Sequence, residues 1–308
     1  MGIIEKAISL ANGKSVRDRP AERPELAGAT AVRPEHQDLA TTREGTDRPD
    51  SQERHGQPPS QIANEPAARK SSQTVQVDVE RLTAMGMVTP ATTGTRISEE
   101  FRLIKRPLLT NAFSYGPGAA PKRNLVMVTS AVAGEGKTFS SINLAMSIAM
   151  ERDRRVLLID ADLQRPNVAQ VLGISTDRGL TDVMEDPSLD LSELLLQTNI
   201  PRLSVLPAGR RHQYGTELLA SDAMKDLVEE LSERYPDRLV IFDSPPLLAA
   251  TQAVVLASLA GQIVVVVAAG STSQGVVSEA LALLDAEKPV GLILNRYPRV
   301  FQSEYYYG

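Results

Sequence analysis

The sequence predicts an α/β fold in which a mostly parallel β-sheet is covered by helices on both faces. Three features predict it. Short apolar runs alternate with helical patterns along residues 125–295. Most of these runs are apolar throughout, as expected for parallel strands that are buried on both faces. The first run leads through a loop of small residues directly into a helical pattern.

Bulk composition narrows the classes of protein that this chain fits. Its 308 residues suffice for one large α/β domain and additional segments. The net charge of −5 makes nucleic acid a disfavoured partner. The chain has no cysteine, which excludes disulfides, zinc–thiolate sites and thiol nucleophiles and fits a reducing compartment. The three histidines are scattered and lack metal-ligand spacing.

The N-terminal part differs in composition from the rest. Residues 1–12 have an amphipathic pattern that fits a short docking helix or a frayed terminus equally well. Residues 13–74 hold seven prolines and many charges of both signs but few large apolar residues. Such a segment cannot bury enough surface to offset its chain entropy, so we expect a disordered linker. The folded domain is expected at residues 75–296.

Two elements are expected before the first long apolar run. Residues 75–79 alternate between apolar and polar like a short strand. Ser98 is expected to cap a helix that runs through Lys105. Pro107 is expected to bend or end that helix, because proline lacks a backbone N–H group.

The apolar runs predict the strands of the sheet. These runs are residues 125–128, 155–162, 203–206, 239–242, 263–267 and 291–294. The clearest helical patterns between them are residues 222–235 and 273–286. Residues 244–278 carry no charge, but prolines, glycines and polar pairs interrupt them. A buried helix and a buried strand explain this stretch better than a membrane span, so we expect no membrane span.

The loop after the first run, within residues 128–138, has the pattern of a phosphate-binding P-loop. Strand, glycine-rich loop and helix follow one another in the order that such a loop requires. Backbone N–H groups and the helix N-terminus would surround the phosphates. The residues expected there are Ala133, Gly134, Glu135, Gly136, Lys137, Thr138 and Phe139. Lys137 would reach the β and γ phosphates, and the Thr138 hydroxyl would ligate Mg²⁺.

Three aspartates close two of the apolar runs. Asp160 and Asp162 are two positions apart, a spacing that places both carboxylates on one side of a strand end. Asp243 closes another run, before Ser244-Pro245-Pro246. Because ligands bind at the carboxyl ends of parallel strands, we expect these acids beside the P-loop, at a site for magnesium and nucleophile activation. Any single aspartate would also fit a helix cap, but three in this arrangement favour a site.

With these motifs the chain resembles the bacterial protein-tyrosine kinases of polysaccharide synthesis. Within them it is most similar to the soluble exosortase-associated tyrosine autokinases. The resemblance covers residues 80–308 and extends to the first ten residues. It rests on the motifs at residues 134–138, 158–166, 206–209, 216–219 and 242–246 and on the terminal tyrosines.

The resemblance implies an autokinase that uses ATP and Mg²⁺. Lys137 and Thr138 would bind the phosphates and the metal. Asp160 is implied to be the general base on the attacking tyrosine, with Asp162 and Asp243 in the magnesium shell. Among all these assignments, the division of roles between the acids depends most on the resemblance.

Asn295 and the C-terminal tail complete the implied site. Asn295 stands where related ATPases read adenine, and an ordinary strand-end asparagine explains it equally well. The tail, residues 297–308, follows a polar segment and lies at a terminus, so we expect it to be mobile. Surface packing of its aromatic residues is the alternative. The resemblance implies that the phosphate acceptors are Tyr305, Tyr306 and Tyr307.

The resemblance also implies partners. Glu99, Arg102 and Lys105 match a Glu-x-x-Arg-x-x-Arg helix that joins subunits of a homo-oligomer, with lysine in place of the last arginine. Gln164 replaces an arginine that is common after the paired acids. Such kinases commonly work with a separate membrane chain-length protein that activates them. We therefore expect a cytoplasmic kinase that is held at the inner membrane by this partner and that regulates exopolysaccharide synthesis.

Two other functions compete with this interpretation. A MinD- or ParA-like positioning ATPase would share the core, but such ATPases carry an extra lysine early in the loop, where this chain has Val132. They also lack a terminal tyrosine cluster. A non-catalytic scaffold that uses ATP only for assembly is disfavoured, because Lys137, Thr138 and all three acids are present.

Overall fold

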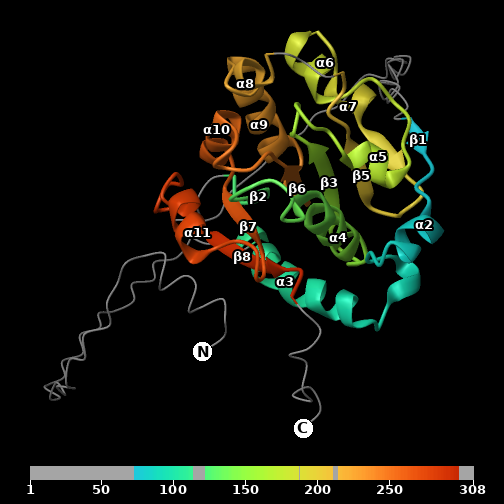
Figure 1. Cartoon of the computed structure of the whole chain (residues 1–308). Helices are drawn as coiled ribbons and strands as arrows, with labels where there is room; N and C mark the ends of the chain where they lie inside the picture. Colours follow the sequence, from blue (N-terminus) through green and yellow to red (C-terminus); the bar gives the residue numbers. More distant parts are fainter. Residues whose placement is uncertain (1–72, 114–121, 187, 211–213, 298–308) are drawn as a thin grey trace, which may run out of the picture. The chain divides into compact units, whose positions relative to one another are not determined.

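An eight-stranded β-sheet is the centre of the part of the chain that the computed structural model describes, residues 73–113, 122–186, 188–210 and 214–297 (Figure 1). The strand order is β1-β4-β5-β3-β6-β2-β7-β8. The strands are β1 (Thr74–Val75), β2 (Leu125–Ser130), β3 (Arg155–Asp160), β4 (Leu196–Thr198), β5 (Leu203–Leu206), β6 (Arg238–Asp243), β7 (Gln262–Ala268) and β8 (Val290–Asn295). The expected N-terminal helix, nearly all of the expected linker and the acceptor tyrosines lie outside the described residues.

The sheet is mostly parallel, as predicted. All strand pairs are parallel except β4 with β5, which is antiparallel. Strands β2, β6 and β7 are buried along their whole length, which explains why the middle of each strand is apolar. In the register of β3 with β6, Asp160 lies opposite Asp243. The carboxyl ends of the central strands therefore bring two of the predicted acids together.

Helices cover both faces of the sheet (Figure 1). They are α2 (Val79–Ala84), α3 (Arg96–Phe113), α4 (Lys137–Ala149), α5 (Val168–Leu172), α6 (Leu180–Glu185), α7 (Leu191–Leu194), α8 (Gly215–Leu219), α9 (Asp222–Arg234), α10 (Thr251–Leu259) and α11 (Gln274–Leu281), with a 3₁₀ turn, η1, at Pro90–Thr92. One core packs α3 and α4 against Val126, Val128 and their neighbours. The other packs α9 and α10 against Met127, Phe242 and their neighbours. The predicted α/β architecture is thus confirmed.

The N-terminal elements differ from the sequence prediction. The strand expected at residues 75–79 is only two residues long, because Asp78 caps α2 by accepting a hydrogen bond from the Arg81 N–H (2.9 Å). Helix α3 begins at Arg96, so Ser98 lies inside it and is not its cap. The Ser98 hydroxyl instead donates to the carbonyl of Thr92 (2.6 Å) and secures the preceding 3₁₀ turn.

Helix α3 also continues through Pro107 to Phe113 instead of ending there. A proline inside a helix removes one main-chain hydrogen bond. Phe101 and Leu108, on either side of the proline in the sequence, are both buried in the core. This packing holds the helix together where the local sequence predicts an end or a bend.

The uncharged stretch at residues 244–278 forms α10, β7 and the start of α11. Across the described ranges, no helix has both the length and the apolar character that crossing a bilayer requires. Helix α11 ends at Leu281, several residues before the predicted end.

Candidate functional site

The predicted P-loop joins β2 to α4, and two glycines determine its shape. Gly134 and Gly136 have φ values of 86° and 96°, in the left-handed region that glycine tolerates best. A Cβ atom on Gly136 would also lie 2.1 Å from Nδ2 of Asn295. Lys137 is the first residue of α4, so the loop leads directly to a helix N-terminus, where backbone N–H groups favour anions.

Asp243, at the end of β6, is bound to the first turn of α4. The hydroxyl of Thr138 donates to its Oδ2 (2.7 Å), and the hydroxyl of Ser141 donates to its Oδ1 (3.0 Å). Burial raises the pKa of Asp243 to about 6, although both hydroxyl hydrogen bonds oppose the shift. The sequence prediction did not include Ser141. Its position three residues after Thr138, on the same face of a helix, is the signal that could have identified it.

The pair Thr138 and Asp243 fits a magnesium ion that is held mainly by phosphates. Mg²⁺ commonly takes one or two protein carboxylates and completes its shell with phosphate oxygens and water. A hydroxyl and a carboxylate in direct contact offer two such oxygens at one point. Among the described residues, no three His, Cys, Asp or Glu side chains gather into a metal site.

Asp160 is buried, with 1% of its surface exposed. Its Oδ2 accepts hydrogen bonds from the N–H groups of Asn167 and Val168 (2.9 Å each), and its Oδ1 accepts one from the Asp162 N–H (3.3 Å). Burial, together with the charge of Asp243, raises the pKa of Asp160 to about 8. Through its three hydrogen bonds to backbone N–H groups, the Asp160 carboxyl group holds the loop that follows β3.

Asp162 lies past the end of β3, so the alternation of a strand does not decide where its side chain points. It is partly exposed, and its Oδ1 accepts a hydrogen bond from the N–H of Arg165 (3.0 Å). Its charge adds to the upward shift of the pKa of Asp243. Asp162 is thus more accessible than Asp160, the other acid of the predicted pair.

Asn295 ends β8 and contacts the P-loop backbone. Its side-chain amide donates to the carbonyl of Glu135 (2.8 Å). The structure thus gives Asn295 a role that the sequence did not indicate, which is contact with the P-loop itself. Reading of adenine by Asn295 stays a prediction. Val132, where positioning ATPases carry their extra lysine, has an exposed side chain.

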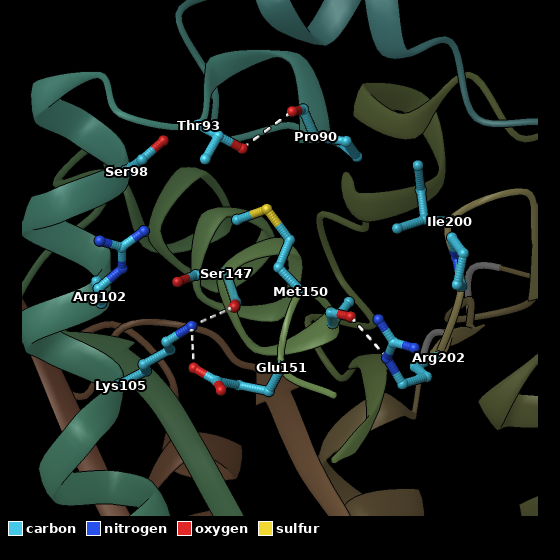
Figure 2. A pocket seen from close by; sticks show the side chains of 12 residues that line it. Pro90, Thr93, Ser98, Arg102, Lys105, Ser147, Met150, Glu151, Ile200 and Arg202 are labelled. Carbon is cyan, nitrogen blue, oxygen red and sulfur yellow. Dashed lines mark hydrogen bonds and ion pairs between the residues drawn. The ribbon is translucent and has the colours of Figure 1, made fainter. Parts of the chain in front are cut away.

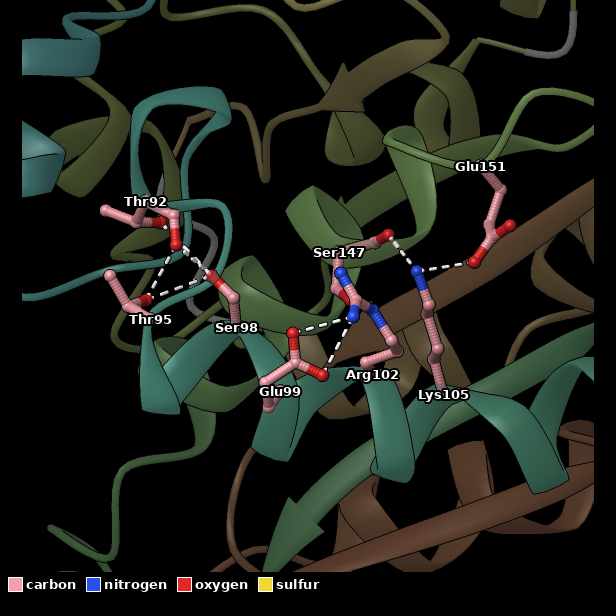
Figure 3. Close-up of polar contacts among 8 residues, drawn as sticks. All are labelled: Thr92, Thr95, Ser98, Glu99, Arg102, Lys105, Ser147 and Glu151. Carbon is pink, nitrogen blue, oxygen red and sulfur yellow. Dashed lines mark hydrogen bonds and ion pairs between the residues drawn. The ribbon is translucent and has the colours of Figure 1, made fainter. Parts of the chain in front are cut away.

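The three residues of the predicted subunit-contact helix lie in different environments along α3 (Figure 3). Arg102 donates to both carboxylate oxygens of Glu99 (2.6 and 2.8 Å) at the surface. Lys105 is only 4% exposed. Its ammonium group donates to the main-chain carbonyl of Ser147 and forms an ion pair with Glu151, both at 2.6 Å. Lys105 therefore fastens α3 to the end of α4, whereas Glu99 and Arg102 pair with each other at the surface.

A cavity of about 550 Å³ lies beside this contact (Figure 2). Its wall includes Arg102, Lys105, Ser147, Met150, Ile200 and Arg202. Arg202 donates through Nε to the carbonyl of Ala149 (3.0 Å). Lys105 and Arg202 thus donate hydrogen bonds to main-chain carbonyls at the C-terminal end of α4, where positive charge is favourable. This end lies about 18 Å along the helix from Lys137, at 1.5 Å per residue.

Comparison with known proteins decides the family. A family model described as an AAA domain matches residues 124–286. The tyrosine-protein kinase YwqD of Bacillus subtilis is 38% identical over 187 residues, which are 59% of this chain and 77% of YwqD. The chain belongs to the bacterial protein-tyrosine kinases. The kinase is also 29% identical over 213 residues to the putative tyrosine-protein kinase CapB of Staphylococcus aureus, covering 68% of this chain and 89% of CapB.

Solved structures agree with this assignment. The kinase domain of the Escherichia coli tyrosine kinase ETK superposes with a TM-score of 0.59 at 27% identity, covering 77% of this kinase and 94% of that chain. The VpsO kinase domain gives a TM-score of 0.55 at 31% identity, covering 71% and 97%. Some relatives are much longer, since the match to wzc of Salmonella typhimurium spans only 24% of it. The predicted family is confirmed, and the exosortase-associated subgroup stays a prediction.

Proposed function

We propose that this protein-tyrosine kinase transfers the γ-phosphoryl group of ATP to its own C-terminal tyrosines, Tyr305, Tyr306 and Tyr307. The observation that carries the proposal is the contact between Thr138 at the P-loop helix and Asp243 at the end of β6 (2.7 Å). It joins a phosphate-binding element to a metal-binding acid, the two parts that phosphoryl transfer needs side by side.

We assign the following roles to the chain's own residues. Lys137 neutralises charge on the transferring phosphoryl group, and backbone N–H groups of residues 133–139 hold the phosphates. Thr138, Asp162 and Asp243 would hold Mg²⁺, which would supply positive charge against the negative charge of the phosphates. Asn295 would contact the adenine side of the nucleotide.

Asp160 is proposed as the general base that accepts the tyrosine proton. Once ionised, Asp160 would be a stronger base than an ordinary carboxylate, because its pKa is raised. The positive charge of bound Mg²⁺ would favour this ionised form over the protonated one. An ionised carboxylate offers about four lone-pair sites. Backbone N–H groups occupy three of them in Asp160, which orients the carboxylate and leaves one site for the substrate.

We further propose that the reaction runs between subunits of a homo-oligomer. Tyr305 lies ten positions after Asn295, at the end of β8, and ten extended residues reach about 35 Å at most. That length suffices to enter a neighbouring subunit, and the exposed pair Glu99 and Arg102 offers both signs of charge for the contact. The folded domain would be residues 75–296, with the linker at 13–74 outside the chemistry.

The wider setting is also a proposal. A membrane chain-length protein would activate the kinase in trans and hold it at the cytoplasmic side of the inner membrane, and exopolysaccharide synthesis would be the regulated process. The proposal is supported by the family alone, because no described residue identifies the activator.

Incubation of the purified chain with ATP and Mg²⁺ tests the core of the proposal. Phosphotyrosine should appear, and mass spectrometry should locate it at the terminal tyrosines. ADP release without phosphotyrosine would favour a positioning ATPase instead. Phosphotyrosine elsewhere in the chain would support autokinase activity but overturn the assignment of the acceptors.

A further inference from the structure

The side chain of Glu135 occupies an unexpected place for an acid in a phosphate-binding loop. It is 1% exposed and is directed into the protein. A carboxylate that faced the phosphates would repel them, at a cost that grows in a site of low dielectric constant. The Glu135 carboxylate instead contacts donor groups of the chain itself.

The Glu135 carboxylate accepts three hydrogen bonds from two parts of the chain. Its Oε2 accepts from the N–H of Val132 within the P-loop (2.8 Å). Its Oε1 accepts from the N–H of Ala268 (3.1 Å) and from the hydroxyl of Thr272 (2.5 Å). Hydrogen bonds to an ionised acceptor are about twice as strong as those between neutral groups.

These bonds tie the P-loop to the neighbouring strand ends. Ala268 is the last residue of β7, and Thr272 follows in the turn before α11. Asn295, the last residue of β8, donates to the main-chain carbonyl of the same Glu135. Ala268 and Asn295 are partners in the β7–β8 register. One residue of the loop is thus anchored to both strands on that side of the sheet.

The loop needs such an anchor because of its glycines. Gly134 and Gly136 flank Glu135, and glycine loses more conformational freedom on ordering than any other residue. A loop that nucleotide had to order would bind it less tightly, since the cost of ordering is subtracted from the affinity. A loop that is already held in shape avoids this cost.

We propose that Glu135 is a positioning residue, which holds the P-loop in its phosphate-receiving shape before ATP binds. The inference rests on the proposed use of this loop for the phosphates of ATP. Glu135 acts through the loop backbone and does not touch the reacting atoms. Its removal should therefore weaken nucleotide binding and leave the chemical step nearly unchanged.

Two substitutions at this position give a graded test. Glu135→Ala removes all three hydrogen bonds of the carboxylate. Glu135→Gln keeps the shape, but an amide has one acceptor oxygen and one NH₂ group, so it cannot accept from Val132 and Ala268 at once. Thr272→Val removes only the bond from the Thr272 hydroxyl. Glu233→Ala is the matched control, because it removes an exposed carboxylate of α9.

The experiment measures the Kd of Mg·ADP by calorimetry and the KM and kcat of autophosphorylation on the full chain. Glu135→Ala should raise Kd and KM by about tenfold or more, with kcat at saturating ATP within about threefold of wild type. Glu135→Gln and Thr272→Val should fall between it and wild type, and Glu233→Ala should match wild type.

Three outcomes would overturn the inference. Unchanged Kd with a lower melting temperature would make Glu135 a purely structural residue, and a loss of kcat at unchanged Kd would place it in the chemical step. If the wild-type chain binds ADP no better than Lys137→Ala does, the proposed nucleotide site and this inference are overturned together. If Glu135→Ala fails to fold, the isosteric Glu135→Gln and Thr272→Val carry the comparison.

Discussion

Asp160 and Asp243 lie opposite each other in the β3–β6 ladder, and both are almost fully buried, with 1% and 2% exposed. Two carboxyl groups that share a site with little water resist ionising together. Burial accordingly raises the pKa of Asp160 to about 8, with the charge of Asp243 adding to it, and burial raises the pKa of Asp243 to about 6.

This pair predicts how the stability of the nucleotide-free chain depends on pH. In the unfolded chain both groups titrate near 3.8, so above that pH the folded chain binds more protons than the unfolded chain. Stability from this pair is therefore complete below about pH 4 and is lost as pH rises through about 6 to 8. Urea unfolding in a chelator should show a free energy of unfolding that falls more steeply from pH 5 to 8 in wild type than in Asp243→Asn. Equal slopes would contradict the prediction.

Lys137→Ala should reduce autophosphorylation by about 100-fold or more, the size of the loss when one strong electrostatic contact to a transition state is removed. The assay is anti-phosphotyrosine detection after incubation with ATP and Mg²⁺. Lys225→Ala, which changes an exposed lysine of α9, should retain full activity. Near-normal activity of a correctly folded Lys137→Ala chain would contradict the site assignment.

Substitutions in α3 should affect either the stability of the monomer or its self-association, depending on the residue changed. Lys105→Met should lower the free energy of unfolding by about 1–3 kcal/mol, because it leaves the Ser147 carbonyl without its charged donor. Arg102→Ala should leave the monomer's stability nearly unchanged, since its ion pair with Glu99 is exposed, and should weaken self-association. Chemical unfolding and analytical ultracentrifugation measure the two effects. A Lys105→Met chain that loses assembly but no stability would reverse these roles.

A chain that lacks residues 1–72 should fold and bind ATP. We choose this end point because the carbonyl of Gln73 accepts a hydrogen bond from the Gln197 N–H (2.9 Å), beside the pairing of β1 with β4. The composition of residues 13–72 supports no core of its own. Circular dichroism and calorimetry with Mg·ADP check the result. An insoluble chain, or one that cannot bind nucleotide, would show that the N-terminal segment belongs to the folded domain.

Mixing two variants, neither of which can phosphorylate its own tail, tests phosphorylation between subunits. One variant is Lys137→Ala, and the other replaces Tyr305, Tyr306 and Tyr307 with phenylalanine. Phosphotyrosine on the Lys137→Ala chain would establish transfer between subunits, because that chain has acceptors but no working site. If neither chain is labelled while wild type is, the reaction occurs within one chain. Labelled tails carry added negative charge and should weaken assembly by mutual repulsion.

The sequence by itself determined the architecture and the position of the glycine-rich loop between β2 and α4. Strands that are buried on both faces are built mainly from apolar residues, so the apolar run at residues 263–267 lies within β7. The P-loop pattern could also be predicted from the sequence, because a loop that bends around phosphates needs glycines, a lysine and a helix start within a few residues. In these cases the physical cause acts on adjacent residues, and the local pattern records it.

Only the tertiary structure decided which residues meet across the sheet. Ser141 and Asp243 are 102 positions apart, and Glu135 and Thr272 are 137 apart. The course of α3 through Pro107 and the burial of Lys105 depend in the same way on packing against distant segments. A pattern of residues shows whether a side chain is buried and in what kind of element it lies. It does not show which distant group will satisfy a buried carboxylate or ammonium, because that choice is made when the strands take their order in the sheet.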